Sequence, residues 1–132
     1  MPDSFSPIKT AEGWQLSNPS ILSLAAIRAS LAVFDEIGID RLVEKSTLMT
    51  DYLVFLLKKI ETDRIKIITP EPRGCQISIR VLSANKKLFQ QISENGVVAD
   101  WREPDVIRVA PVPLYNCFLE VWKFYSILKR LL

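Results

Sequence analysis

The spacing of apolar residues changes from a helical period to a period of two in mid-chain, and this change constrains the fold more than any other feature. Up to about residue 60, apolar residues recur at helical spacing. After a breaker at 70–74 (PEPRG), they alternate with polar residues over 75–81, which predicts a half-buried strand. Since an all-helical bundle does not contain such a segment, the chain combines helices with a sheet.

Two helices are predicted before the sheet. The first contains the apolar segment 21–34, begins within residues 17–19 and ends at Gly38. It is apolar on so much of its surface that we expect burial on more than one side. The second is an amphipathic helix that Asp40 caps and that runs to about Ile60. Its predicted core-facing residues are Leu42, Met49, Leu53, Leu56 and Ile60.

The second half of the chain alternates strands with shorter helices. We expect strands at 65–67 and 75–81, a helix at 85–94, strands at 97–101 and 106–109, and a last helix that Asn116 caps. The apolar stripe of the last helix is predicted to be Phe118, Val121, Trp122, Tyr125 and Leu128. A five-residue connection predicts an antiparallel pair for the first two strands. The fold class is α+β, with helices covering one face of a small, mainly antiparallel sheet.

Length and composition exclude several classes of function. The 132 residues fit one domain, and 17 basic against 15 acidic side chains give no sign of a nucleic-acid or anionic-membrane surface. The longest apolar stretch is too short and too polar to span a membrane. With no histidine, the chain cannot form a Ser-His-Asp or Cys-His catalytic system or a histidine-ligated zinc site within itself.

Cysteine usage and the first residues indicate a cellular compartment. The two cysteines, Cys75 and Cys117, are far apart, and a small secreted framework would use more bridges. We therefore expect buried free thiols in a reducing, cytoplasmic environment. Residues 1–10 lack the basic start and apolar core of a signal peptide.

Arg108 is the most informative polar residue, because it lies inside the apolar strand at 106–109. A guanidinium in such a place is costly unless it is paired. One interpretation is capture of a ligand carboxylate, which the planar fork suits. The other is an internal ion pair, or an edge-strand arginine that reaches water, and residue chemistry alone favours it.

Asn18 allows two interpretations as well. It can cap the first helix, which residue chemistry favours, or present its amide to a ligand. No group of residues has the spacing of a metal site, and the isolated glycines exclude a phosphate-binding loop. Each lysine falls on a polar face or beside other charges, so none is a convincing point of cofactor attachment.

Three separate blocks of sequence resemble the kynureninase family. The first is 13–19 (GWQLSNP), and the second is 67–70 (IITP) followed by 73–76 (RGCQ). The third and most specific runs from 96 to 116 (GVVADWREPDVIRVAPVPLYN). The blocks stand in the family's order, and the resemblance covers essentially the whole chain.

The resemblance implies a role for this chain within a larger enzyme. Kynureninases are homodimeric pyridoxal-phosphate enzymes of the aspartate-aminotransferase-like fold (fold type I), and they hydrolyse L-kynurenine or 3-hydroxykynurenine in tryptophan breakdown and NAD synthesis. This chain resembles their small C-terminal domain, with 1–18 as the connecting segment from the large domain and 19–132 as the small domain. Arg108 aligns with the arginine that binds the substrate α-carboxylate, which reverses the preference stated above. Ser17 and Asn18 align with residues that contact the aromatic end of kynurenine near the dimer interface.

The family's catalytic residues and its pyridoxal-phosphate site belong to the large domain. The resemblance therefore implies that this chain alone binds no cofactor and is inactive, since substrate binding without an electron sink cannot cleave a carbon–carbon bond. The expected partners are the small-molecule substrate, the large domain and a second copy. The alternative is a free-standing, non-catalytic α+β module that binds a small carboxylate or a protein partner.

Overall fold

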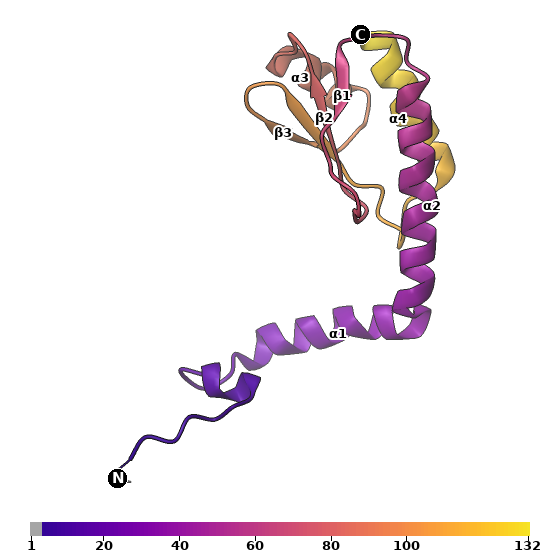
Figure 1. Ribbon diagram of the computed structural model, residues 1–132. Coiled ribbons are helices and arrows are strands. Elements are labelled where there is room, and N and C mark those ends of the chain that lie inside the picture. Colours follow the sequence, from indigo (N-terminus) through magenta and orange to yellow (C-terminus); the bar gives the residue numbers. More distant parts are fainter. Residues whose placement is uncertain (1–3) are drawn as a thin grey trace. The chain divides into compact units, whose positions relative to one another are not determined.

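The computed structural model describes residues 4–132, which belong to two compact units. The first unit ends at Gly38, and the second begins at Ile39. Figure 1 shows the helices and strands of both units along the chain. Among residues 4–132, every helix is too short or too polar to cross a membrane.

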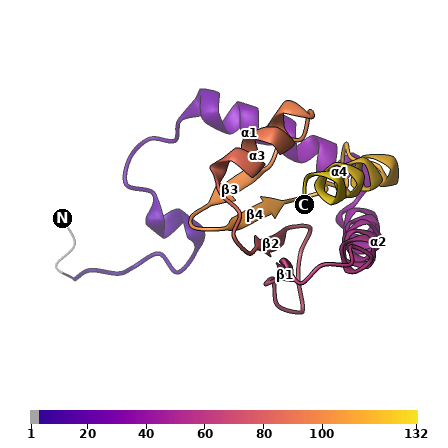
Figure 2. The ribbon, with the colours of Figure 1, turned by 90° about the horizontal axis from the view of Figure 1, so that it is seen from above.

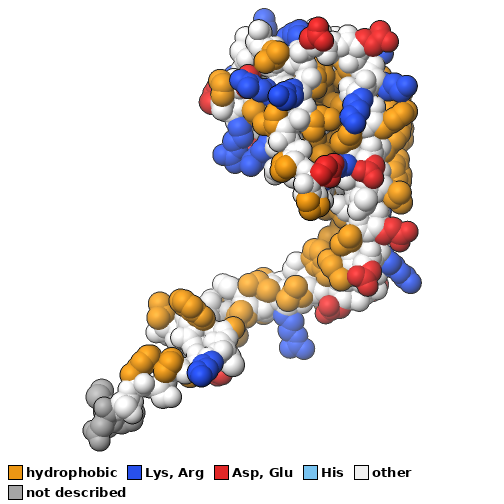
Figure 3. Space-filling view, viewed as in Figure 1, with side chains coloured by type: hydrophobic (Ala, Val, Ile, Leu, Met, Phe, Trp, Pro, Cys, Tyr) orange, Lys and Arg blue, Asp and Glu red, His pale blue; other side chains and the backbone are white. Residues whose placement is uncertain are grey.

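The first unit contains a 3₁₀ turn, Ala11–Trp14, and helix α1, Ile21–Ile37. The N-cap of α1 is Ser20, just after the predicted start. Gly38 ends the helix, as predicted, with a φ of 86° that glycine adopts without strain. None of the α1 side chains is buried, so the prediction of burial on more than one side is wrong for this chain by itself. Apolar side chains lie open along α1 instead (Figure 3).

The second unit contains three helices and four strands. They are α2 (Ile39–Lys58), β1 (Ile65–Ile67), β2 (Ile77–Val81), α3 (Lys86–Glu94), β3 (Asp100–Arg102), β4 (Val106–Val109) and α4 (Phe118–Leu131). The strands form one sheet in the order β1-β2-β4-β3, and each neighbouring pair is antiparallel. The predicted α+β class is confirmed, as is the antiparallel pairing of the first two strands.

One face of the sheet forms the core with the helices. Ile79 lies opposite Ile67 on one side and Ile107 on the other, and it is fully buried. Buried residues of α2, α3 and α4 join the same hydrophobic cluster. Figure 2 shows α2 and α4 lying side by side next to the sheet. All five predicted core residues of α2 and its C-terminal end are buried.

The opposite face of the sheet is polar because side chains alternate along each strand. The cross-strand neighbours that share this face form two rows. The first row is Lys66, Arg80, Val106 and Arg102, and the second is Ser78, Arg108 and Asp100. The helices thus cover one face, and the charged groups of both rows lie on the other.

Two strands differ from their predicted bounds. The strand predicted at 97–101 begins only at Asp100, because Gly96 N and Val97 N still bond to carbonyls of α3 and complete its last turn. The strand predicted at 75–81 begins at Ile77, opposite Val109. Pairing stops there because β4 is followed by Pro111, which has no N–H to donate.

The helix boundaries also need correction. Asp40 lies inside the first turn of α2 rather than at its cap, and α2 ends at Lys58 rather than near Ile60. The N-cap of α4 is Cys117, one residue after the predicted Asn116. Cys117 has an exposed thiol, so its predicted burial is wrong, whereas Cys75 is half-buried.

The buried face of α4 is rotated from the predicted stripe. Val121 and Leu128 are buried as predicted, but Phe124 takes the third buried position. Phe118 and Trp122 are about half exposed, at 44% and 48%. Val121, Phe124 and Leu128 are spaced three and four residues apart, so they lie on one side of α4. This side faces the core.

Candidate functional site

The site is built around Arg108, at the third position of the inner strand β4. Its neighbours Ile107 and Val109 point into the core, so the alternation of the strand places Arg108 on the polar face. Ser78 lies directly opposite it on β2, and Asp100 lies directly opposite it on β3. The Arg108 side chain is 32% exposed, which leaves it accessible from that face.

Asp100 is the ion-pair partner of Arg108. The Nε and Nη2 atoms of Arg108 both donate hydrogen bonds to Oδ2 of Asp100, with an Nε–Oδ2 distance of 2.8 Å. Arg102 Nε donates to the same oxygen from 3.0 Å. Arg108 is thus held by a carboxylate that is itself shared between two guanidinium groups.

The ion pair with Asp100 leaves one edge of the Arg108 guanidinium free. A guanidinium offers two edges to a carboxylate, one formed by Nε and Nη2 and the other by Nη1 and Nη2. Asp100 engages the first edge. In the part of the chain that the structure describes, no hydrogen bond engages Nη1 of Arg108. The second edge can therefore accept a carboxylate without breaking the ion pair.

Electrostatics keep Asp100 ionised. Its hydrogen bond from Arg108 lowers the pKa of the Asp100 carboxyl below the ordinary value of 3.8, and loss of hydration opposes this. Arg102 lowers the same pKa further, through its hydrogen bond and its charge. At neutral pH the cluster of Asp100, Arg102 and Arg108 therefore carries a net charge of about +1.

A second ion pair lies on the same side of the sheet. Arg80 Nε contacts both carboxylate oxygens of Asp105, at 3.0 and 3.2 Å. Lys66 lies opposite Arg80 on β1. With Arg102 and Arg108 this face holds four cationic groups against two carboxylates, so it favours an anionic ligand.

Ser17 and Asn18 lie in the first unit, where they precede α1 and are exposed. The carbonyl of Ser17 accepts a hydrogen bond from Gln15 Nε2 at 2.9 Å. Because Ser20 is the N-cap of α1, the interpretation of Asn18 as its cap is wrong. The predicted ligand roles of Ser17 and Asn18 stay predictions.

Among residues 4–132, no lysine is buried as a desolvated cofactor-binding lysine would be. A lysine that forms an imine with the cofactor must be desolvated or flanked by another cation. Eight of the nine lysines are exposed, and Lys45 donates its ammonium to the carbonyl of Pro113 at 2.7 Å. Over residues 4–132 there is also no group of three His, Cys, Asp or Glu residues arranged to hold a metal.

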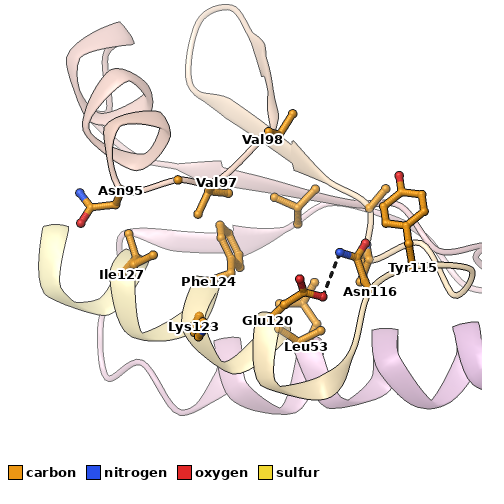
Figure 4. Close-up of a pocket in the computed structure, with 15 residues that line it drawn as sticks. Leu53, Asn95, Val97, Val98, Tyr115, Asn116, Glu120, Lys123, Phe124 and Ile127 are labelled. Carbon is orange, nitrogen blue, oxygen red and sulfur yellow. Dashed lines mark hydrogen bonds between the residues drawn. The ribbon is translucent and has the colours of Figure 1, made fainter.

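A cleft of about 540 Å³ lies between α4, the segment after α3 and the end of β4 (Figure 4). Its wall is mixed, with Val97, Phe124 and Ile127 among the apolar lining residues and Tyr115 and Lys123 among the polar ones. Its Asn116 and Glu120 side chains are hydrogen-bonded to each other at 3.2 Å. The cleft is therefore lined by both polar and apolar groups, and Arg108 is not among its lining residues.

Asp100 is the site residue that the sequence interpretation missed. A signal for it exists, because a three-residue turn at 103–105 places Arg102 opposite Val106 and hence Asp100 opposite Arg108. The prediction ended this strand at residue 101, one residue before its actual end at Arg102, so it did not give this register. The internal ion pair that residue chemistry favours for Arg108 is present, and it coexists with a free edge of the fork.

The fold is similar to part of a known class of enzymes. Acetylornithine aminotransferase from Elizabethkingia anophelis superimposes with a TM-score of 0.68 over 91% of this chain and 32% of that chain, at 18% sequence identity. The α+β sheet with its one-sided helices is therefore the fold of a domain of aminotransferase-like, fold-type I enzymes.

The family is narrower than the fold. The kynureninase C-terminal domain model matches residues 42–128, and the chain belongs to this family. A kynureninase of Koribacter versatilis is 50% identical over 127 residues, which cover 94% of this chain and 30% of the relative. A kynureninase of Flavobacterium psychrophilum is 45% identical over 136 residues, which cover 98% and 32%. The chain thus spans about a third of the length of these relatives.

Proposed function

We propose that this chain is the substrate-binding C-terminal domain of a kynureninase, and that Arg108 binds the α-carboxylate of L-kynurenine. The observation that carries this proposal is the free Nη1–Nη2 edge of Arg108 on the cationic face of the sheet. A planar, bidentate donor pair matches a carboxylate in both shape and charge. The activity to which the domain contributes is hydrolysis of L-kynurenine to anthranilate and L-alanine.

Ser17 and Asn18 complete the proposal at the other end of the substrate. Both side chains are exposed in the segment before α1. The Asn18 amide can donate and accept hydrogen bonds, so it suits the polar substituents of an aromatic ring. We infer that both residues contact the aromatic end of kynurenine, at the interface of a homodimer.

The chain alone is inactive under this proposal. Pyridoxal phosphate, when bound in the complete enzyme, supplies the electron sink for the reaction, and no lysine among residues 4–132 is buried as a desolvated cofactor-binding lysine would be. A solution of this chain mixed with pyridoxal phosphate and then dialysed is expected to show no cofactor absorbance band. A stable band would contradict this part of the proposal.

The open apolar surface of the first unit supports a large partner. Leu16 is fully exposed and Trp14 is 87% exposed, and α1 adds further apolar side chains (Figure 3). Patches of this kind are usually buried in an interface. Because the relatives are about three times as long as this chain, we propose that the large domain of the same enzyme covers this surface in the cytoplasm.

The role of Arg108 is tested by Arg108→Gln in a full-length kynureninase that contains this domain. Losing hydrogen bonds to a charged group costs about 1.5–3 kcal/mol, so KM for L-kynurenine is expected to rise about 10- to 150-fold. Lys66→Gln is the matched control, because it removes one positive charge from the same face. An unchanged KM in Arg108→Gln, or an equal rise in Lys66→Gln, would contradict the proposal and favour a non-catalytic module.

A further inference from the structure

We propose that Asp100 is a positioning residue for substrate binding, because it holds the Arg108 guanidinium so that its Nη1–Nη2 edge faces the ligand. This inference rests on the proposed role of Arg108 and adds a residue to it. Asp100 itself does not touch the substrate carboxylate in this scheme, since two anions in contact would repel each other.

Strand register fixes the pair. Asp100 and Arg108 are direct cross-strand partners of β3 and β4, so both side chains leave the same face of the sheet at neighbouring points. The flanking pairs, Trp101 with Ile107 and Arg102 with Val106, continue the same register. The backbone of two paired strands therefore sets where the carboxylate meets the guanidinium.

Hydrogen bonding fixes the orientation of the fork. Oδ2 of Asp100 accepts from both Nε and Nη2 of Arg108, which fixes the edge of the guanidinium that faces Asp100 and the edge that faces away from it. Arginine otherwise has a long side chain with many rotamers, and ordering it on binding weakens affinity. A fork that is already ordered avoids this loss when the ligand arrives.

Arg102 keeps Asp100 available for this task. Its Nε donates to the same Oδ2 atom at 3.0 Å, and it compensates the negative charge of Asp100. With both arginines present the cluster stays cationic, so Asp100 orients Arg108 without cancelling its attraction for an anion. The carboxylate of the ligand would occupy the outer Nη1–Nη2 edge, which Asp100 leaves free.

The experiment compares two ligands in a full-length kynureninase that contains this domain. L-Kynurenine carries the α-carboxylate, and kynuramine is its counterpart without it. The dissociation constant of each is measured by rapid mixing, before turnover, for the parent enzyme, Asp100→Asn, Arg108→Gln and the double variant. Glu103→Gln is the control, because it removes one carboxylate from the turn after β3 and Glu103 is exposed.

Asp100→Asn is expected to weaken L-kynurenine binding about 3- to 10-fold, because the Arg108 side chain must then be ordered when the ligand binds. Kynuramine binding is expected to stay unchanged, because kynuramine has no carboxylate for Arg108 to bind. In the Arg108→Gln background the Asp100→Asn change should have no further effect, because there is no fork left to orient. Glu103→Gln should bind both ligands like the parent enzyme.

Other outcomes overturn the inference in recognisable ways. Tighter L-kynurenine binding by Asp100→Asn would make Asp100 a competitor, and equal weakening of both ligands would make its role purely structural. If Arg108→Gln does not weaken L-kynurenine binding relative to kynuramine, the proposed function itself fails. If Arg108→Gln does so but Asp100→Asn has no effect, only the positioning role fails.

Discussion

Ile79 is a fully buried residue of the sheet, at the centre of its second strand. It is 0% exposed and lies opposite Ile67 of β1 and Ile107 of β4. Its side chain therefore contributes to the packing of three strands at once. Since β2 also pairs with the strand that carries Arg108, loosening this point disturbs the support of the site.

The size of the effect follows from the atoms removed. Ile79→Val deletes one buried methyl group and should destabilise the chain by about 0.5–1.5 kcal/mol. Ile79→Ala deletes more of the side chain and leaves a cavity, so the expected loss is about 2–5 kcal/mol. Ile68→Val is the matched control, because Ile68 lies one residue beyond β1 and is 44% exposed, and it should change stability by at most about 0.5 kcal/mol.

Urea denaturation followed by far-ultraviolet circular dichroism measures these losses in free energy of unfolding. The midpoints should fall in the order Ile68→Val, Ile79→Val and Ile79→Ala, with an unchanged slope against urea. A loss for Ile79→Ala no larger than that for Ile68→Val would show that Ile79 is not in the core, and would refute the register described here.

Two further predictions concern carboxylates. The pKa of Asp100, measured by NMR, should lie below 3.8 and should rise toward 3.8 in Arg108→Gln. Because folding lowers this pKa, the Asp100–Arg108 ion pair stabilises the folded state at pH values above 3.8. This stabilisation is lost as the pH falls through the pKa of Asp100 in the folded state. Glu120 accepts a hydrogen bond from Cys117 N at 2.8 Å and another from the Asn116 amide, so Glu120→Ala should speed amide hydrogen exchange in the first turn of α4 and leave its last turn unchanged.

Hydrophobic periodicity was sufficient to predict the element order and fold class. The alternation of Ile77, Ile79 and Val81 with polar residues predicts a strand with one buried face, and all three are buried. The spacing of Leu42, Met49, Leu53 and Leu56 likewise identified the buried stripe of α2. These signals are local, so the sequence contains them without knowledge of the partner elements.

Features that depend on contacts between elements were predicted less well. The start of β3 depends on where α3 and its last turn end. This end is set by the hydrogen bonds that Gly96 N and Val97 N donate to carbonyls of α3. The role of Asp100 depends on strand register, which a shift of one residue in the turn conceals. Helix α1 has the composition of a buried helix, and periodicity does not reveal that its side chains lie open in this chain.

The central claim is that Arg108 binds the substrate carboxylate through the edge that Asp100 leaves free. The most direct measurement is a crystal structure of full-length kynureninase containing this domain, with a bound, unreactive analogue of L-kynurenine that keeps the α-carboxylate. We expect the two carboxylate oxygens within about 2.7–3.2 Å of Nη1 and Nη2 of Arg108, while Nε still contacts Asp100. A carboxylate bound by other residues, or one that displaces Asp100 from Nε, would contradict the account.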